Sequence, residues 1–232
     1  MYHILNWNTG LTEDDQFLEE ILQYIKGFLD QDNSIAVLQQ IPYKDYENKW
    51  NLHAIYMRIL EVFPEIEYSI IKNDNFNNGY IIMMTVIITK LKTWDYCDDV
   101  VYPDAIASNR EVAIKLHDKY SLLGLHAKNG QENLSYIKSI SNYADIIVGD
   151  FNAGDYDQYP YWKIFRSILE SHVCICNMPT KVIFSSTGEL LRKSCIDHVF
   201  VRRELVSKCS CMKVHEDITF SDHYPITFGI GL

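Results

Sequence analysis

Hydrophobic and polar residues alternate along the chain with two different periods. In residues 13–30, apolar side chains recur every three or four positions, so Phe17, Ile21 and Ile25 share one face of a predicted amphipathic helix. Shorter apolar runs, many of them rich in β-branched residues, are typical of strands. The predicted strands cover residues 2–7, 35–38, 66–72, 80–90, 111–117, 120–126, 146–148, 172–176, 181–184, 195–201, 208–214 and 224–230.

Three further helices are predicted, over residues 50–62, 131–142 and 159–171, the first of them ended by Pro64. Strands outnumber helices, and hairpins mix with strand–helix–strand units. This pattern favours a layered α/β protein with mixed sheets over an eight-fold barrel or a Rossmann sheet. No repeat, low-complexity tract or linker-like run occurs, so we expect a single domain over residues 1–232. Neither a G-x-G-x-x-G nor a Walker-type phosphate-binding motif is present.

The composition is that of a globular protein with an acidic balance. Of the 232 residues, 47% are hydrophobic and 13% aromatic, which is enough to bury a sizeable core. The formal net charge is −10, whereas nucleic-acid-binding proteins usually carry a basic face. The charge argues against a long duplex as the substrate, although a local basic strip or a bridging cation would still allow contact with phosphates.

No segment has the features of a membrane span or of a secretion signal. No stretch approaches the ~20 apolar residues that span a bilayer, and the start of the chain has no basic region followed by an apolar one. Since the candidate chemistry already begins at Asn8, we expect a cytoplasmic location. The six cysteines include two C-x-C pairs in predicted strands, a spacing unlike that of common zinc sites. Reduced thiols are expected, with disulfides or a metal site as the alternatives.

Polar and acidic residues lie repeatedly at the ends of the predicted buried strands. In layered α/β proteins, side chains at such strand ends project from a rigid frame into a shared cleft. The segments concerned are Asn6–Trp7–Asn8, Gln39–Gln40, His126, Gly149–Asp150–Phe151–Asn152, Asp197–His198 and Ser221–Asp222–His223. So many strand-end polar groups in one chain indicate a single functional site.

Part of this set is suited to a magnesium ion. Magnesium takes a few hard oxygen ligands and keeps several waters together with substrate phosphate oxygens. Asn8, Gln40 and Asp222 can supply such a sparse set of oxygens. We therefore expect a divalent cation at this site, with Mn²⁺ as a substitute for Mg²⁺.

The remaining residues are suited to hydrolysis of a phosphoester. Attack on a phosphodiester needs an oriented water, while negative charge grows on the phosphoryl oxygens and on the leaving oxygen. Asp150 can hold or deprotonate that water, and Asn152, His126 and His223 can stabilise phosphoryl oxygens. Asp197 can accept the other N–H of His223 and so select its tautomer. His198 is left out of the catalytic set, because it can be structural beside Asp197.

The order of these segments resembles the endonuclease/exonuclease/phosphatase superfamily. Its members include pancreatic-type deoxyribonucleases, abasic-site endonucleases, neutral sphingomyelinases and inositol-phosphate phosphatases. The matching motifs are Trp7–Asn8, Leu38–Gln39–Gln40, Leu125–His126, Gly149–Asp150–Phe151–Asn152, Ile196–Asp197–His198 and Ser221–Asp222–His223. A single motif such as G-D-x-N is weak evidence, but all six in the family's order are specific.

This resemblance implies a DNase I-like four-layer α/β sandwich, in which helices flank two mixed β-sheets. It also implies magnesium-dependent hydrolysis of phosphodiester bonds, with DNA as the leading substrate. By the same resemblance, Arg110 matches an arginine that the nuclease branch places near the substrate phosphate. From the sequence alone, Arg110 can equally be a surface residue at the start of a strand.

Position 40 departs from the family pattern, which has the principal metal-ligating Glu where this chain has Gln40. A neutral amide still offers an oxygen to a cation but brings no charge, so metal binding is expected to weaken by about 1.5–3 kcal/mol. Three explanations remain open: an engineered inactivating substitution, a natural variant with weaker use of the metal, and a pseudoenzyme that kept the scaffold.

Two other functions are compatible with the sequence. The net charge and the lack of an obvious basic stripe favour a phosphatase or phosphodiesterase that acts on a small molecule or on a lipid headgroup. A protein of another class, a catalytically silent module that binds nucleic acid or protein, is the second alternative. The choice among DNA, RNA and small phosphoesters, and between endo and exo cleavage, stays open at this point.

Overall fold

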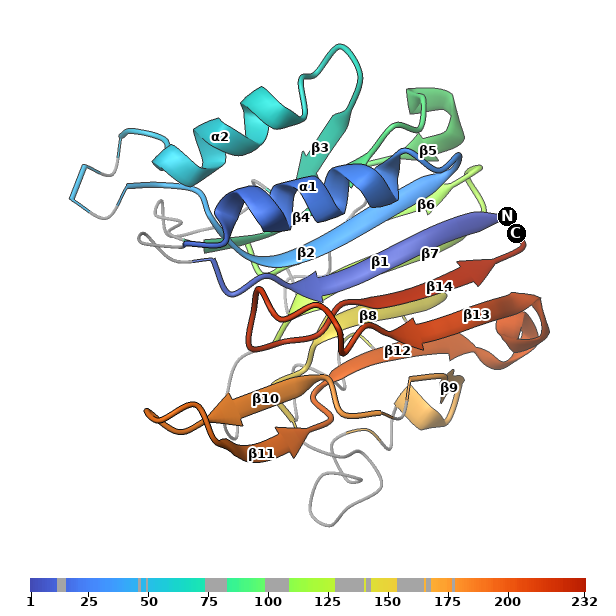
Figure 1. Cartoon of the computed structure of the whole chain (residues 1–232). Helices are drawn as coiled ribbons and strands as arrows, with labels where there is room; N and C mark the ends of the chain where they lie inside the picture. Colours follow the sequence, from blue (N-terminus) through green and yellow to red (C-terminus); the bar gives the residue numbers. More distant parts are fainter. Residues whose placement is uncertain are drawn as a thin grey trace.

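The computed structural model places two large β-sheets against each other (Figure 1). The structure describes residues 1–11, 16–45, 47–48, 50–73, 83–98, 109–127, 140, 143–153, 165, 168–176 and 178–232.

The first sheet has the strand order β13-β14-β1-β2-β4-β3. Its strands are β1 (Tyr2–Asn8), β2 (Ser34–Pro42), β3 (Ser69–Lys72), β4 (Met83–Thr89), β13 (Cys209–Val214) and β14 (Ile226–Ile230). β1 and β2 are parallel, and the other neighbours are antiparallel, so the sheet is mixed. The central strands β1 and β2 are buried along almost their whole length.

The second sheet has the strand order β5-β6-β7-β8-β12-β9. Its strands are β5 (Tyr96–Cys97), β6 (Glu111–Leu116), β7 (Tyr120–His126), β8 (Ile146–Asp150), β9 (His172–Cys174) and β12 (Asp197–Arg202). β7 and β8 are parallel, and the other pairs are antiparallel. A separate hairpin, β10 (Lys181–Phe184) with β11 (Leu190–Ser194), extends beside the two sheets (Figure 1).

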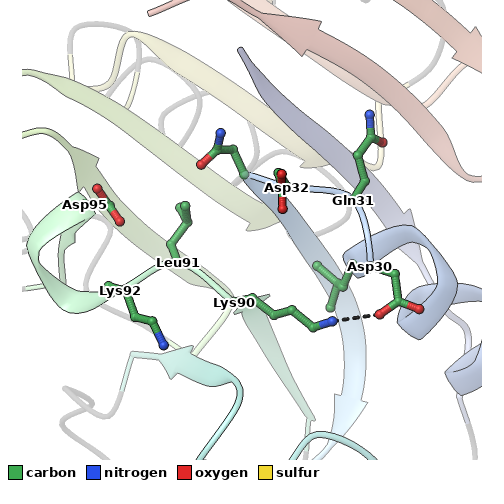
Figure 2. A pocket seen from close by; sticks show the side chains of 9 residues that line it. Asp30, Gln31, Asp32, Lys90, Leu91, Lys92 and Asp95 are labelled. Atoms are coloured by element: carbon green, nitrogen blue, oxygen red, sulfur yellow. Dashed lines mark hydrogen bonds and ion pairs between the residues drawn. The ribbon is translucent and has the colours of Figure 1, made fainter.

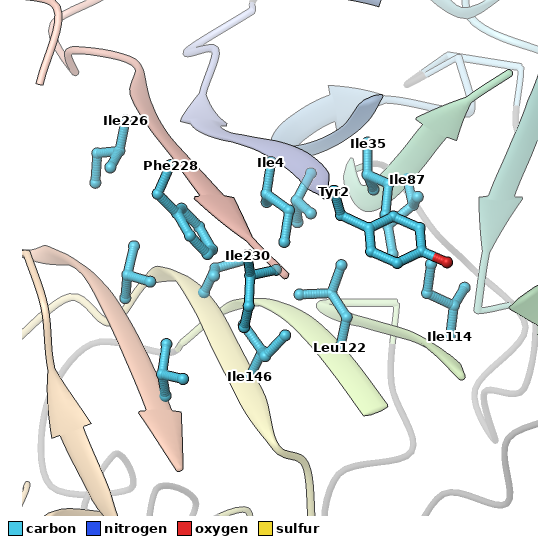
Figure 3. Packing of buried hydrophobic residues seen from close by; sticks show 14 of the residues in the cluster. Tyr2, Ile4, Ile35, Ile87, Ile114, Leu122, Ile146, Ile226, Phe228 and Ile230 are labelled. Atoms are coloured by element: carbon cyan, nitrogen blue, oxygen red, sulfur yellow. The ribbon is translucent and has the colours of Figure 1, made fainter. Parts of the chain in front are cut away.

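The main core lies between the facing surfaces of the two sheets. Ile4 and Ile35 from the first sheet face Leu122 and Ile146 from the second (Figure 3), and all four side chains are fully buried. Apolar side chains from β12 and β14 extend this cluster. Because alternate residues of a strand point to opposite faces, every second residue of the central strands contributes to this layer.

The two sheets approach each other closely where Gly124 of β7 lies against Val37 of β2. A Cβ added to Gly124 would lie 2.3 Å from Val37 Cγ1, a separation too short for two carbon atoms that are not bonded to each other. Val37 lies on the inner face of the first sheet and is fully buried. Glycine at position 124 therefore permits the close contact of the two sheets.

Helices α1 (Leu18–Leu29) and α2 (Ala54–Val62) cover the outer face of the first sheet (Figure 1). Ile21 and Ile25 of α1 pack there with Leu5 and Trp7, the residues of β1 that point outward. The outer face of the second sheet carries another cluster, in which Leu123, Ile147 and Phe200 pack with Phe151, Phe165 and Ile168. The expected fold class, a sandwich of two mixed sheets flanked by helices, is confirmed.

Most predicted elements are confirmed within a few residues. α1 begins at Leu18 rather than at residue 13, and residues 12–15 lie outside the described part of the chain. α2 begins at Ala54 rather than at residue 50, because His53 Nδ1 caps it by accepting a hydrogen bond from Ile55 N over 3.2 Å. Most of the helices predicted over residues 131–142 and 159–171 lies outside the described residues.

Within the described part of the chain, two short strands and two short helices were not predicted. They are β5, β11, and the 3₁₀ helices η1 (Thr93–Asp95) and η2 (Arg203–Lys208). Among the described residues, no helix is long and apolar enough to cross a lipid bilayer. The cytoplasmic location stays a prediction.

Candidate active site

The predicted site residues gather where the central strands of the two sheets end. Asp150, the last residue of β8, lies between its neighbours His126 of β7 and Asp197 of β12 in the register of the second sheet. Asn8 is the last residue of β1 in the first sheet. Strands that are hydrogen-bonded along their length hold these polar groups at one edge of the sandwich.

A hydrogen bond between the two sheets connects Asn8 with Asp150. Asn8 Nδ2 donates to Asp150 Oδ2 over 2.9 Å, and both side chains are buried. The carbonyl oxygen of the Asn8 side chain accepts from Gly10 N over 3.2 Å, which fixes the orientation of the amide. Ser221 Oγ donates to the main-chain oxygen of Asn8 over 2.9 Å and so brings the 221–223 segment to the same place.

Asp197 and His223 form a second buried pair. His223 Nδ1 lies 2.8 Å from Asp197 Oδ2, and the main chain of His223 is held by Trp7 Nε1, which donates to its carbonyl oxygen over 2.9 Å. Thr180 Oγ1 accepts a hydrogen bond from Asp197 N over 3.1 Å. Because a carboxylate only accepts hydrogen bonds, this contact requires a proton on His223 Nδ1.

The charges of this cluster shift the ionisation of all three of its members. Burial, together with the charge of Asp197, raises the pKa of Asp150 to about 6. Burial acts to raise the pKa of Asp197 as well, but the charge and hydrogen bond of His223 outweigh it, so this pKa lies below its ordinary value. Burial acts to lower the pKa of His223, but Asp197 and Asp150 raise it above its ordinary value.

His126 lies beside Asp150 in a different electrostatic state. Its Nε2 is 3.7 Å from Asp150 Oδ2, too far for a hydrogen bond. Burial, with the nearby charges of Arg110 and His223, lowers the pKa of His126 to about 4. His126 is therefore neutral at physiological pH, and a neutral imidazole offers one N–H donor and one acceptor.

Arg110 lies at the same strand end. Its Nη1 donates to the main-chain oxygen of His126 over 3.1 Å and reaches that of Ala127 at 3.4 Å. The guanidinium is thus held against the end of β7, and the residue is partly buried.

The loop after β8 takes an unusual backbone conformation. Asn152 has a positive φ of 47°, its N–H donates to Asp150 Oδ1 over 2.7 Å, and its Nδ2 donates to Ala127 O over 2.8 Å. Gly149 has a φ of +150°, and a Cβ there would lie 1.9 Å from Leu125 O, so only glycine fits. These contacts hold Asp150 and Asn152 together at the end of β8.

Gln40 lies one residue beyond the register partner of Asn8. Asn8 pairs with Gln39 in the parallel register of β1 and β2, and the ladder between β2 and β4 is interrupted by a bulge between Leu38 and Ile41. Gln40 has a positive φ of 58° within this bulge and is half-buried. Because of the bulge, the side chains of Gln39 and Gln40 have different surroundings. Gln39 is fully buried, and its Nε2 donates to the Oδ1 of buried Asn6 over 3.0 Å.

Asp222 is the exposed member of the set, with half of its side chain accessible. A Cβ on Gly10 would lie 3.5 Å from Asp222 Oδ1, so this carboxylate lies over the loop that follows Asn8. Its other oxygen, Oδ2, is 3.0 Å from Lys181 Nζ. The structure therefore joins Asn8, His126, Asp150, Asn152, Asp197, Asp222, His223 and Arg110 in one network, with Gln40 at the same edge of the first sheet.

Sequence reasoning missed Lys181. This residue begins β10, and its Nζ lies 3.0 Å both from His223 Nε2 and from Asp222 Oδ2. The available signal was a polar residue at the start of a predicted strand, over residues 181–184, but nothing in the sequence pairs that strand start with a histidine 42 positions later.

The donor set fits a hard divalent cation. Asp150, Asp197 and His223 can each present a ligand atom such that all three lie within 4.8 Å of one another, among the described residues. Asn8 Oδ1 and the exposed Asp222 carboxylate add hard oxygens nearby. Mg²⁺ prefers such oxygens and keeps part of its water shell, which an open position at Asp222 permits.

His198 and the cysteines lie apart from this chemistry. His198 is fully buried and packs against the rings of Phe151 and Phe165, which supports its structural role. None of the six cysteines lies in a disulfide bond. Burial raises the pKa of Cys174 and of Cys176 to about 12, so these thiols stay protonated.

A hollow of about 380 Å³ lies at the opposite end of the first sheet, where β2 begins and β4 ends (Figure 2). Lys90 spans its rim in an ion pair with Asp30, at an Nζ–Oδ1 distance of 2.7 Å. Neither residue contacts the carboxylate–histidine network. The hollow is thus separate from the candidate site.

Several solved structures have the same fold as this molecule. No family model matches the chain, and no curated protein matches its sequence. The whole chain superposes on 99% of the endonuclease domain of TRAS1, a telomere-specific non-LTR retrotransposon, with a TM-score of 0.64 at 17% sequence identity. It also superposes on all of the 3′ phosphatase NExo from Neisseria, solved with a product DNA hairpin, with a TM-score of 0.66 at 13% identity.

A third similar structure is an endonuclease/exonuclease/phosphatase family protein from Leptotrichia buccalis C-1013-b. Both chains are covered completely, with a TM-score of 0.65 at 16% identity. The chain therefore has the DNase I-like fold of the endonuclease/exonuclease/phosphatase superfamily, the fold that its sequence motifs predicted.

Proposed function

We infer that this protein is a magnesium-dependent phosphodiesterase, with DNA as its leading substrate. The observation that carries this conclusion is the placement of Asp150, whose buried carboxylate contacts Asn8 and lies within 4 Å of both His126 and His223. This is the geometry needed to orient a water against a phosphorus centre. We further propose that residues 1–232 act as a single domain.

Asp150 has the properties of the residue that positions and deprotonates the attacking water. With a pKa of about 6, it is a carboxylate at neutral pH and a stronger base than an ordinary aspartate. Asn8 fixes the orientation of its Oδ2, and the main chain of Asn152 fixes its Oδ1. Such two-sided support limits the rotation of the carboxylate, as a catalytic base requires.

The histidines and Asn152 would stabilise the phosphoryl oxygens. His223, held by Asp197 with its Nε2 toward the site, can carry a positive charge because its pKa is raised. His126 would act as a neutral donor, since its pKa is low. Arg110, next to His126, would add a positive charge for the phosphate.

Asn8, Gln40 and Asp222 are the proposed ligands of Mg²⁺, with Mn²⁺ as a substitute, while the neighbouring donors Asp150, Asp197 and His223 serve the attacking water and the phosphoryl group. A divalent cation bound there supplies charge that neutralises the phosphoryl group. Gln40 contributes an amide oxygen without charge, so Asp222 carries the single negative charge of the three. We therefore expect weak metal binding, with the fold and the catalytic residues intact.

A substrate panel tests this function. The protein, and its Gln40→Glu variant, would be incubated with Mg²⁺ or Mn²⁺ and with plasmid DNA, single-stranded DNA, 3′-phosphorylated oligonucleotides, RNA and bis-p-nitrophenyl phosphate. We expect cleavage of DNA that EDTA abolishes and that Gln40→Glu increases. Turnover of small phosphoesters alone would favour the alternative, a small-molecule or lipid phosphoesterase, to which the net charge of −10 also points. No turnover by either form would contradict the proposal and favour a silent binding module.

A further inference from the structure

Lys181 is held against the candidate site by main-chain pairing. It forms an isolated antiparallel bridge with His223. On one side of this bridge Tyr224 N donates to Thr180 O over 2.6 Å, and on the other the amide that follows Lys181 donates to Asp222 O over 2.8 Å. The Lys181 backbone is thus paired on both sides, with β11 through Ser194 and with the 222–224 segment.

The Lys181 side chain ends between two site residues. Its Nζ lies 3.0 Å from His223 Nε2 and 3.0 Å from Asp222 Oδ2, and the side chain is 27% exposed. An ammonium group can only donate hydrogen bonds, so His223 Nε2 accepts this bond while His223 is neutral, and the bond is lost when His223 takes up a proton. This requirement agrees with a proton on Nδ1, donated to Asp197. The ammonium consequently lies at the mouth of the site with one side toward solvent.

The proposed metal ligands carry little negative charge, and Lys181 already forms an ion pair with the charge that is present. Of Asn8, Gln40 and Asp222, only Asp222 is charged, and Lys181 Nζ contacts it directly. The site thus combines a neutral residue at position 40 with a fixed positive charge at position 181. A lysine ammonium is a compact point charge, which binds phosphate oxygens well.

We propose that Lys181 is a phosphate-binding residue of this site. Its ammonium donates to a non-bridging oxygen of the substrate phosphoryl group, and so shares with the cation the task of neutralising that group. The assignment rests on the proposed phosphoesterase function and adds a residue to it. It has a distinctive consequence: the site binds phosphate without any divalent cation.

Calorimetric titration with inorganic phosphate, in buffer that contains EDTA, tests this assignment. The native chain is expected to bind phosphate, Lys181→Met to bind it at least about tenfold more weakly, and Lys181→Arg to retain most of the affinity. Lys193→Met is the matched control, because Lys193 is an ammonium on the opposite strand of the same hairpin, paired with Glu216 at 2.6 Å. The phosphate affinity of the Lys193→Met protein should equal that of the native chain.

Thermal unfolding would show that each variant is folded, and Lys181→Gln would replace Lys181→Met if methionine prevents folding. No phosphate binding by the native chain in EDTA, or equal affinity in native and Lys181→Met protein, would overturn the assignment. Weaker phosphate binding in Lys181→Met supports the assignment even if no phosphodiester is hydrolysed. A lack of hydrolysis would contradict only the proposed function.

Discussion

Asn8 at the end of β1 donates a hydrogen bond to Asp150 at the end of β8, and so connects the two sheets at the candidate site. The bond is 2.9 Å long and buried. It means that the base proposed for catalysis is oriented by a residue from the other half of the sandwich. The packing of the sheets and the geometry of the site are therefore coupled.

Replacing Asn8 by aspartate should raise the pKa of Asp150 further. The new carboxylate would lie about where Asn8 Nδ2 now donates, and a like charge at that distance disfavours the ionised form of Asp150. We expect the rising limb of the pH–rate profile to move to higher pH in Asn8→Asp, as measured at saturating Mg²⁺. An unchanged limb would show that Asp150 is not the group that controls the rate.

Gln40→Glu should strengthen metal binding. A carboxylate at position 40 adds one charge-assisted contact, worth about 1.5–3 kcal/mol, so the half-saturating Mg²⁺ concentration should fall about tenfold or more. Calorimetric Mg²⁺ titration measures this without any need for turnover. Gln31→Glu, an equal change of charge at an exposed position in the remote hollow, is the control. Equal effects of the two substitutions would place the cation elsewhere.

His126 should make stability depend on pH between about 4 and 6.5. In the unfolded chain a histidine binds a proton below its ordinary pKa of 6.5, whereas folded His126 binds one only below about 4. The contribution of neutral His126 to the free energy of unfolding is therefore present above pH 6.5 and is lost as the pH falls through this window. This lowering of the His126 pKa corresponds to about 3 kcal/mol of unfolding free energy.

Denaturant unfolding of native protein and His126→Gln at pH 7 and pH 4.5 measures this contribution. The variant should lose less stability on acidification than the native chain. A comparison with the variant is needed because Asp150, whose raised pKa acts in the opposite direction, titrates in the same window in both proteins. Equal losses in both proteins would contradict the buried, neutral state of His126.

Gly124→Ala should destabilise the sandwich. The added Cβ would lie 2.3 Å from Val37 Cγ1, so the sheets must separate or Val37 must shift, at a cost of about 1–3 kcal/mol. Val37→Ala removes the clashing methyl groups, so the double variant should lose less stability than the two single variants together. A strictly additive loss, measured by chemical denaturation, would show that these residues do not meet.

The strands were predictable from sequence, because buried strands such as β7 and β8 appear as uninterrupted apolar runs. β11 was missed for a physical reason: Leu190 and Leu191 are exposed and lie beside Arg192 and Lys193, so the segment has no buried face to produce an alternating pattern. Its strand conformation depends on pairing with β10, which local sequence does not encode.

The candidate site was predictable to a similar extent. Motifs at strand ends identified Asp150, Asp197 and His223, which the structure brings together. The contact of Lys181 with His223 arises from an isolated bridge between distant segments, and no local pattern indicates it. The same limit applies to the bulge at Gln40, whose positive φ follows from the pairing of β2 with β4.

The central claim is that Asp150 activates water for attack on a phosphodiester. The most direct test compares hydrolysis of single-stranded DNA by the Gln40→Glu protein and by the same protein with Asp150→Asn, at saturating Mg²⁺. Asparagine keeps the shape of Asp150 but cannot accept a proton, so the rate should fall about 10²- to 10⁴-fold while the protein stays folded. Undiminished hydrolysis by a folded Asp150→Asn protein would contradict the account.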